Sequence, residues 1–100
     1  MDWTWTWSGQ CFGYWMGNDL WTYSGRHVGH RAGDEIFSPT GRYLGEVMQN
    51  GRLVTNKAKA GHTGNTFKPR AARTPRPIQA GMSALTIYKG YQDFPHPDLL

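Results

Sequence analysis

Histidine and cysteine are the side chains of this sequence with the greatest capacity for chemistry. His27 and His30 lie three residues apart, and His62 follows later in the chain. Neutral imidazoles bind divalent metals well, but side chains three apart in a β-strand point to opposite faces. Cys11, the single cysteine, has no sequence neighbour that would act as its base. We therefore predict no metal, no cofactor and no catalytic cysteine; an enzyme would require His27, His62 or Cys11 to meet a carboxylate in one pocket.

The acidic and hydroxyl side chains with candidate roles fall beside turn residues. Asp34 and Glu35 are adjacent, whereas a catalytic pair of carboxylates comes from separate elements that converge on a cleft. Ser8 and Ser24 each precede a glycine, but no strand–turn–helix context for a nucleophile surrounds them. We interpret all four as turn formers and predict that the protein is not an enzyme.

Positive charge is concentrated in the second half of the chain. The formal net charge is +4, and no acid lies between Glu46 and Asp93. A basic stretch of this kind can bind nucleic acid or another polyanion by releasing counterions; the alternative is a solvated linker that keeps the protein soluble. The candidate polyanion-binding residues are Lys57, Lys59, Lys68, Arg70, Arg73 and Arg76.

A period of sixteen residues indicates the elements that would hold these side chains. The recurring positions are the glycines Gly13, Gly29, Gly45 and Gly61; the turn positions Gly9, Gly25, Gly41 and Lys57; the bulky residues Trp5, Trp21, Phe37 and Leu53; and Phe12, Val28, Leu44 and Ala60. An aromatic or β-branched run that ends in Ser-Gly and is followed by a return run is typical of a β-hairpin. A glycine inside the return run indicates a bulge or a close backbone approach.

One hairpin cannot bury its apolar face, so we predict an all-β domain in which four hairpins share a core. The residues expected in that core are Trp5, Trp21, Phe37 and Leu53 with Phe12, Val28 and Leu44. The aromatic residues off this register, which would be exposed stacking platforms or cover the hairpins' second side, are Trp3, Trp7, Trp15 and Tyr43. The fourth unit, with Lys57 and Ala60, is irregular, and a meander without rotational symmetry is the alternative architecture.

The repeat units also resemble a known family. The segments Tyr23-Ser24-Gly25-Arg26-His27-Val28-Gly29 and Thr40-Gly41-Arg42-Tyr43-Leu44-Gly45, the second preceded by Asp34-Glu35-Ile36-Phe37, resemble the bacterial 4-fold beta flower proteins. This resemblance covers about residues 3–67 and implies four short hairpins around a pseudo-fourfold axis. It implies no catalytic residues, because the family carries no established activity. A weaker resemblance is to the YD-type repeats of large bacterial surface and toxin proteins, whose acid Ser24 and Thr40 do not match.

The composition changes after Phe67, where three prolines and four basic residues follow within ten positions. Such a segment cannot bury enough apolar surface to fold alone. We predict a β-hairpin repeat domain over residues 3–67, a disordered basic Pro-rich linker over 68–79 and a short tail over 80–100. That tail would be a strand that returns to the domain, a helical turn or a partner-docking segment, and a short docked element is the interpretation we prefer.

Length and cysteine content bound the class of protein. A chain of 100 residues allows one small domain, and a single cysteine allows no internal disulfide. The sequence shows neither a secretory leader nor an apolar run long enough to span a membrane. We expect a bacterial, cytoplasmic, non-enzymatic binding or assembly module with no membrane partner. Its partner would be another protein or a second copy paired through hairpin edges, with nucleic acid as the alternative.

Overall fold

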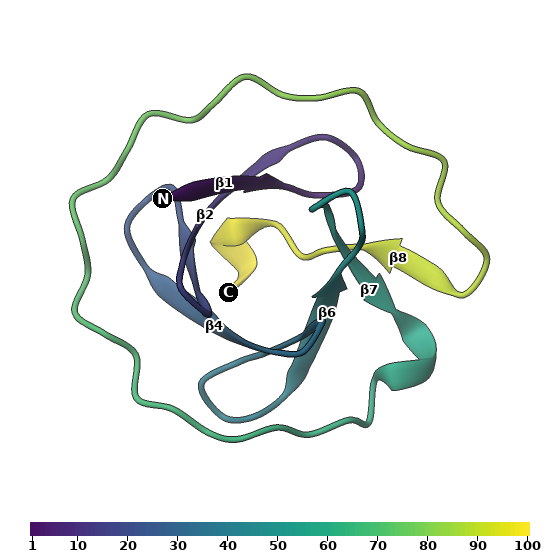
Figure 1. Cartoon of the computed structure of the whole chain (residues 1–100), viewed down its shortest axis with the longest axis horizontal. Helices are drawn as coiled ribbons and strands as arrows, with labels where there is room; N and C mark the ends of the chain where they lie inside the picture. Colours follow the sequence, from purple (N-terminus) through teal and green to yellow (C-terminus); the bar gives the residue numbers. More distant parts are fainter.

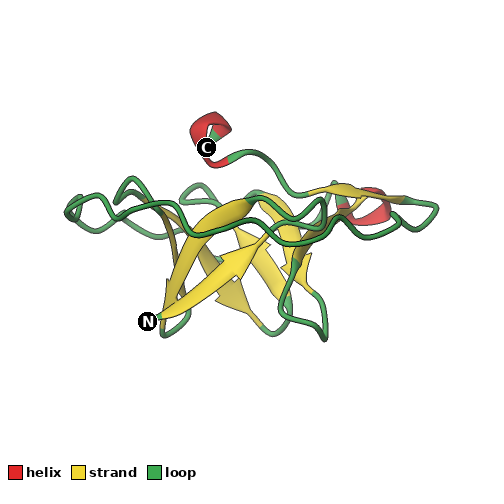
Figure 2. Cartoon of the chain, turned by 90° about the horizontal axis from the view of Figure 1, so that it is seen from above, coloured by secondary structure: helices red, strands yellow, loops and turns green.

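The computed structural model describes all 100 residues and shows an all-β chain. One antiparallel sheet, curled into a half-barrel, contains eight strands in sequence order (Figures 1 and 2). The strands are β1 (Asp2–Trp5), β2 (Cys11–Met16), β3 (Asp19–Thr22), β4 (His27–Ala32), β5 (Glu35–Phe37), β6 (Tyr43–Val47), β7 (Leu53–Asn56) and β8 (Tyr91–Asp93). The helices are two short 3-10 turns, η1 (Lys57–Lys59) and η2 (Pro97–Leu99), and neither has the length or apolar content to cross a membrane.

Three hairpins carry the same irregularity at the same place. The pairings β1/β2, β3/β4 and β5/β6 each slip by one residue, between Thr4 and Trp5, Leu20 and Trp21, and Ile36 and Phe37. The residue left over on the return strand is therefore Phe12, Val28 or Leu44, in each case directly before a glycine. This confirms the bulge predicted from the recurring glycines, because a bulge adds one unpaired residue to one strand.

The core contains eight side chains: Phe12, Trp15, Leu20, Val28, Ile36, Leu44, Leu53 and Phe94. The predicted core positions Phe12, Val28, Leu44 and Leu53 are confirmed. Trp21 and Phe37 are buried as predicted, but they lie outside this cluster, in which their neighbours Leu20 and Ile36 take the positions expected for them. Trp5 is only half-buried. Adjacent residues of a strand face opposite sides, and two apolar residues in succession do not tell which one faces inward.

Of the two interpretations of the remaining aromatic residues, exposed platforms or rings that cover the hairpins, the first is wrong for three of the four. Trp7, Trp15 and Tyr43 are between 5% and 9% exposed. Trp15 lies in the core, and Trp7 donates its indole N–H to the Thr86 carbonyl (3.0 Å). These rings cover the sheet or are themselves covered by the C-terminal half of the chain.

Strand β7 pairs with a strand that follows much later in the chain. Its antiparallel partner is β8, with Val54 opposite Asp93 and Asn56 opposite Tyr91. Phe94, directly after β8, enters the core and contacts Phe12 edge-to-face at 5.2 Å between ring centroids. The expected return run that ends at Gly61 forms no strand, and residues 57–90, which include η1, connect the two paired strands.

Candidate functional site

The most unusual feature of the molecule is the connection between β7 and β8. Residues 63–88, here called the belt, form no helix or strand and run once around the outside of the sheet (Figure 1). The belt lies at one end of the strands, and η2 lies beyond it on the same side (Figure 2). It follows the turns within the first three hairpins, residues 7–9, 23–25 and 39–41, which we call the rim. The belt contacts the third of these turns first and the first of them last. It therefore runs around the sheet in the direction opposite to the order of the hairpins.

The belt binds the rim through backbone hydrogen bonds at a regular spacing. Amides nine residues apart in the belt donate to carbonyls sixteen residues apart in the rim: Gly64 to Gly41 (2.8 Å), Arg73 to Gly25 (2.8 Å) and Met82 to Gly9 (2.9 Å). A second set, three residues further along, repeats the spacing: Phe67 to Pro39 (3.0 Å), Arg76 to Tyr23 (2.8 Å) and Leu85 to Trp7 (3.1 Å). Each nine-residue step of the belt therefore meets one hairpin in the same way.

Each rim turn is held by a pair of hydroxyl side chains. Thr22 and Ser24 share a hydrogen bond of 2.7 Å between their hydroxyl oxygens, and the Thr22 oxygen also accepts the Arg26 amide (3.2 Å). The first and third turns repeat this arrangement with Thr6 and Ser8, and with Ser38 and Thr40. Local hydroxyl–backbone bonds of this type favour turns, which is why the Ser-Gly and Thr-Gly positions of the repeat form them.

The belt passes so close to the rim glycines that no side chain fits between them. A Cβ atom built on Gly25 would lie 2.0 Å from the Arg73 carbonyl oxygen, and one on Gly41 would lie 2.4 Å from that of Gly64. Both glycines have φ in the left-handed region, at +94° and +83°, which L side chains rarely adopt. Glycine at these positions therefore serves the turn and the close approach of the belt together.

A polar cluster attaches the belt beside the second hairpin. The Arg70 amide donates to Nδ1 of His27 (3.0 Å), and its guanidinium Nε donates to Asp19 (2.9 Å). Since Nδ1 accepts, a neutral His27 ring carries its proton on Nε2, which faces Asp19 (3.2 Å) and the Gly29 carbonyl (3.1 Å). The His27 ring stacks between Trp21 and Phe67, at 5.1 and 4.7 Å between centroids.

Asp19 is the charged centre of this cluster. Burial raises the pKa of its carboxyl. Hydrogen bonds from His30 and Arg70, together with the electrostatic attraction of His27 and Arg70, outweigh burial and hold that pKa below its ordinary value. His27 and His30 therefore approach the same carboxylate oxygen, at 3.2 and 3.3 Å. The prediction that they face opposite sides was wrong, because the bulge at Val28 shifts the alternation of β4 by one residue.

The six predicted polyanion-binding residues are distributed along η1 and the belt instead of forming one cluster. Lys59 pairs with Glu46 (2.7 Å), which raises the Lys59 pKa, and Arg70 pairs with Asp19. The Arg73 guanidinium lies over the Trp21 ring (5.3 Å) and that of Arg76 over the Tyr14 ring (5.9 Å). The exposed side chains of Lys57 and Lys68 make no hydrogen bond or ion pair. Polyanion binding by this set stays a prediction.

The remaining candidates for chemistry are occupied in structural contacts. Cys11 is 2% exposed, and burial raises the pKa of its thiol. His62 reaches the Glu35 carboxylate (2.9 Å) at an exposed position beside Tyr43. Burial raises the pKa of Tyr43 to about 12, and its hydroxyl accepts the Asn56 amide (3.1 Å).

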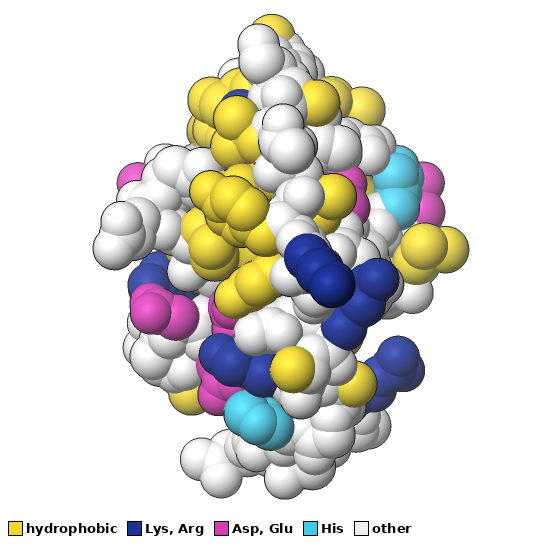
Figure 3. Space-filling model, turned by 90° about the vertical axis from the view of Figure 1, so that its right-hand side faces the viewer, with side chains coloured by type: hydrophobic (Ala, Val, Ile, Leu, Met, Phe, Trp, Pro, Cys, Tyr) yellow, Lys and Arg dark blue, Asp and Glu magenta, His cyan; other side chains and the backbone are white.

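The outer side of the belt presents an apolar surface. Met82, Leu85, Ile87 and Tyr88 are each at least 38% exposed. Hydrophobic side chains gather in the middle of the face that includes the end of the belt, with Lys and Arg side chains beside them (Figure 3). Backbone groups of this stretch bind the rim while these side chains reach solvent, which is the arrangement of a surface available to a partner.

Sequence reasoning missed the belt because its contacts are made by the backbone. We predicted a disordered linker over residues 68–79 because that segment could not fold alone. In the structure it runs along the rim, and its amides donate to carbonyls that the rim turns leave free. The sequence carries one indirect indication of these contacts, which is that no proline occupies a position whose N–H binds the rim. Pro69, Pro75 and Pro77 all stand at positions whose N–H is not used for a contact with the rim.

Comparison of the chain with family models, with curated proteins and with solved structures found no match in any of the three.

Proposed function

We propose that the chain is a non-enzymatic binding module whose rim holds an extended polypeptide by its backbone, and that the belt is that polypeptide in cis. The observation that carries the proposal is the register of nine belt residues to sixteen rim residues, repeated over three turns. A connection whose only role is to link β7 to β8 needs no such register. Recognition through main-chain groups, with side chains left outside, is the way in which proteins capture extended segments of varied sequence.

We further propose that the module consists of four hairpins around a pseudo-fourfold axis, as the resemblance to the 4-fold beta flower proteins implies. Pairing of β7 with β8 supplies the fourth hairpin. The dimensions of the molecule support this symmetry. Its outline measures 37 by 32 Å in the two long directions, so a quarter of the perimeter is about 27 Å, and nine residues of polyproline-like chain span about 28 Å.

A binding role is supported by the state of the side chains on which an enzyme would depend. The Cys11 thiol is buried with a raised pKa, which disfavours the thiolate needed for nucleophilic attack. His27 does meet a carboxylate, Asp19, but both ring nitrogens already have partners and the ring lies between two aromatic residues. That arrangement attaches the belt.

The experiment releases the belt from its covalent connections. A protease site inserted after Gly61 and another after Lys89 cut the folded protein into three pieces, residues 1–61, 62–89 and 90–100. The first and the last, held together by the pairing of β7 with β8, form the body, and residues 62–89 are the belt fragment. We expect the belt fragment to remain with the body in size-exclusion chromatography and native mass spectrometry. A labelled peptide of residues 62–89 should then exchange into the complex. The matched control is the same peptide with two residues inserted between Phe67 and Arg73, which breaks the nine-residue spacing and should bind at least about tenfold more weakly, since two or more hydrogen bonds are lost.

Equal binding of the two peptides would contradict the proposal. So would immediate loss of the belt fragment from a body whose circular dichroism still shows a β-sheet. In either case the belt would be a connection without recognition, and the partner would have to bind elsewhere.

A second candidate function is polyanion binding through the basic residues of η1 and the belt, and the unpaired, exposed side chains of Lys57 and Lys68 favour it. Titration with a short DNA duplex at several salt concentrations tests this function. The double variant Lys57→Gln/Lys68→Gln should reduce the log–log salt slope by about 2, because each phosphate contact contributes about 0.9. Absence of binding at low salt would exclude this candidate and leave the first one untouched.

A further inference from the structure

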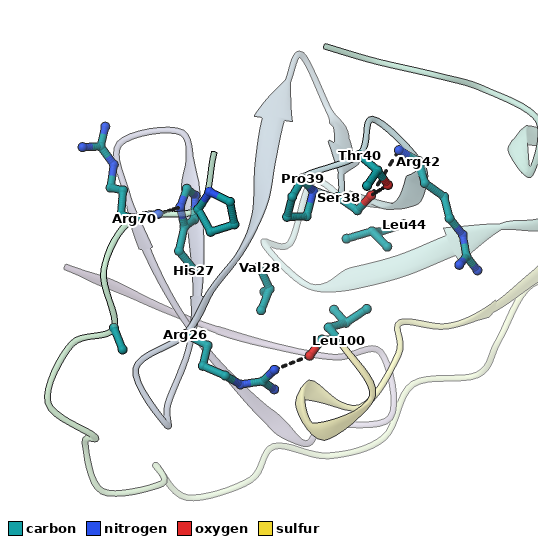
Figure 4. Close-up of a pocket in the computed structure, with 12 residues that line it drawn as sticks. Arg26, His27, Val28, Ser38, Pro39, Thr40, Arg42, Leu44, Arg70 and Leu100 are labelled. Carbon is teal, nitrogen blue, oxygen red and sulfur yellow. Dashed lines mark hydrogen bonds between the residues drawn. The ribbon is translucent and has the colours of Figure 1, made fainter. Parts of the chain in front are cut away.

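A pocket of about 500 Å³ opens between the second and third hairpins, beside the part of the belt that passes them (Figure 4). Val28 and Leu44 form its apolar floor, and Pro39 and the belt residues Pro69 and Ala72 form apolar walls. Its lining residues include Arg26, Arg42 and Arg70, and no acidic residue lines it. Figure 4 shows the Arg26 guanidinium turned toward Leu100, whereas the side chains of Arg42 and Arg70 extend outward from the edge of the pocket. The size falls within the range of small-molecule sites in proteins.

The pocket lies where a contact between neighbouring hairpins is missing. At the junction of the first two hairpins the Tyr23 amide donates to the Phe12 carbonyl (3.2 Å). Sixteen residues later the donor position is Pro39, which has no N–H. One unit further, the Thr55 hydroxyl donates to the Leu44 carbonyl (2.6 Å). Among these three junctions only the middle one lacks a donor at this position, and the pocket lies at that junction.

Two of the three guanidinium groups already have partners. Arg70 pairs with Asp19, and Arg26 donates to the Pro97 carbonyl (2.7 Å) and to the Leu100 carbonyl. Arg42 is exposed and its side chain has no hydrogen bond or ion pair, so this side chain is free to turn across the opening of the pocket that the residue borders. A guanidinium in that position is suited to a carboxylate, which it can bind with two parallel hydrogen bonds.

The chain itself shows which chemistry the pocket accepts. Leu100 places a carbonyl oxygen on Arg26 while its side chain packs against the core that includes Val28 and Leu44 (Figure 4). An oxygen acceptor bound by arginine and attached to an apolar group is therefore already present at one end of the pocket. We propose that the rest of the pocket binds a small amphipathic carboxylic acid, with the carboxylate on Arg42 and the apolar body on Val28, Leu44 and Pro39.

The test uses the full chain, with octanoate as the probe and octanamide, which has the same shape but no charge, as its control. In isothermal titration calorimetry we expect octanoate to bind at least about tenfold more tightly than octanamide, because a hydrogen bond to a charged group is the stronger one. Methyl resonances of Val28 and Leu44 should shift on titration with octanoate. Arg42→Gln should weaken octanoate binding about tenfold or more. Since the exposed Arg42 side chain makes no hydrogen bond or ion pair, this variant should fold normally.

Lys57→Gln is the matched control, because it removes one exposed charge outside the pocket. It should leave octanoate binding unchanged. A second variant, Ala72→Phe, fills the pocket from the belt and should abolish binding of both probes while all three arginines remain. Equal loss in Arg42→Gln and Lys57→Gln would overturn the proposal by showing general charge attraction. No saturable octanoate binding, or shifts confined to residues outside the pocket, would overturn it as well.

Discussion

Substitution of one glycine in the rim measures what the belt contributes to the fold. Gly41 and Gly51 sit in turns with the same hydrogen bonds, in which the glycine amide donates to the residue three positions earlier at 2.9 and 2.8 Å. Their φ angles are +83° and +81°. They differ in their surroundings, since a Cβ on Gly41 would lie 2.4 Å from the Gly64 carbonyl oxygen, whereas a Cβ on Gly51 would meet nothing within 4 Å.

Replacement by alanine should therefore affect the two turns differently. Both variants introduce a Cβ in the left-handed region, at a cost of about 1–2 kcal/mol. Gly41→Ala also displaces the belt and removes two hydrogen bonds, from Gly64 to Gly41 and from Phe67 to Pro39. Since a hydrogen bond contributes about 0.5–1.5 kcal/mol, we expect Gly41→Ala to lower the free energy of unfolding by about 1–3 kcal/mol more than Gly51→Ala.

Urea unfolding followed by tryptophan fluorescence measures both values, and hydrogen exchange of the Gly64 and Phe67 amides shows whether the belt has moved. Those two amides should lose protection in Gly41→Ala and keep it in Gly51→Ala. Equal destabilisation by both substitutions, with both amides unchanged, would refute the argument that the belt presses on the rim.

Three further predictions follow from individual side chains. Asp19→Asn should lower the free energy of unfolding at pH 7 by about 1 kcal/mol, because the carboxylate is a partly exposed partner of Arg70. The pKa of Asp19 is lowered in the folded protein, so the stabilisation by its carboxylate is full above the ordinary pKa of 3.8 and is lost as pH falls through the lowered pKa. Urea titrations at pH 7 and in acid should therefore show a smaller acid-induced loss of unfolding free energy in Asp19→Asn than in the parent. The pKa of Tyr43 is raised to about 12, so the pH dependence is reversed, and the stabilisation is full below pH 10 and lost as pH rises toward 12. Tyr43→Phe should remove the tyrosinate absorbance that appears near pH 12. An unchanged absorbance titration would contradict this assignment. Cys11 should react with a soluble thiol reagent at least roughly tenfold more slowly in the folded chain than in urea, because it is buried and its thiol pKa is raised; equal rates would show that the site opens.

The sequence predicted the strands better than it predicted their inner and outer faces. The sixteen-residue spacing of glycines and the Ser-Gly turns indicated the hairpins and the bulges, and both are present. The faces were not predictable at Leu20-Trp21 and Ile36-Phe37, because two adjacent apolar residues satisfy either register. The alternation along the strand places the second of each pair on the opposite face, outside the core cluster although still buried.

A strand that returns to the domain was one of three alternatives for residues 80–100, and repeat analysis could not choose among them. Phe94 occupies the core beside Phe12, although it lies outside the sixteen-residue series that ends at Ala60. Pairing of β7 with β8 depends on a contact between distant segments, which carries no local pattern. The pocket was missed for the same reason, since the effect of Pro39 is visible only when the neighbouring hairpin is placed beside it.

Hydrogen exchange of the belt amides in the intact protein tests the central claim most directly. The account predicts protection at the amides that bind the rim, which are Gly64, Phe67, Arg73, Arg76, Met82 and Leu85. It predicts fast exchange at amides between them that have no acceptor, such as Lys68, Thr74 and Ser83. Protection that recurs every nine residues would establish the belt on its rim, whereas uniformly fast exchange from residue 63 to residue 88 would contradict it.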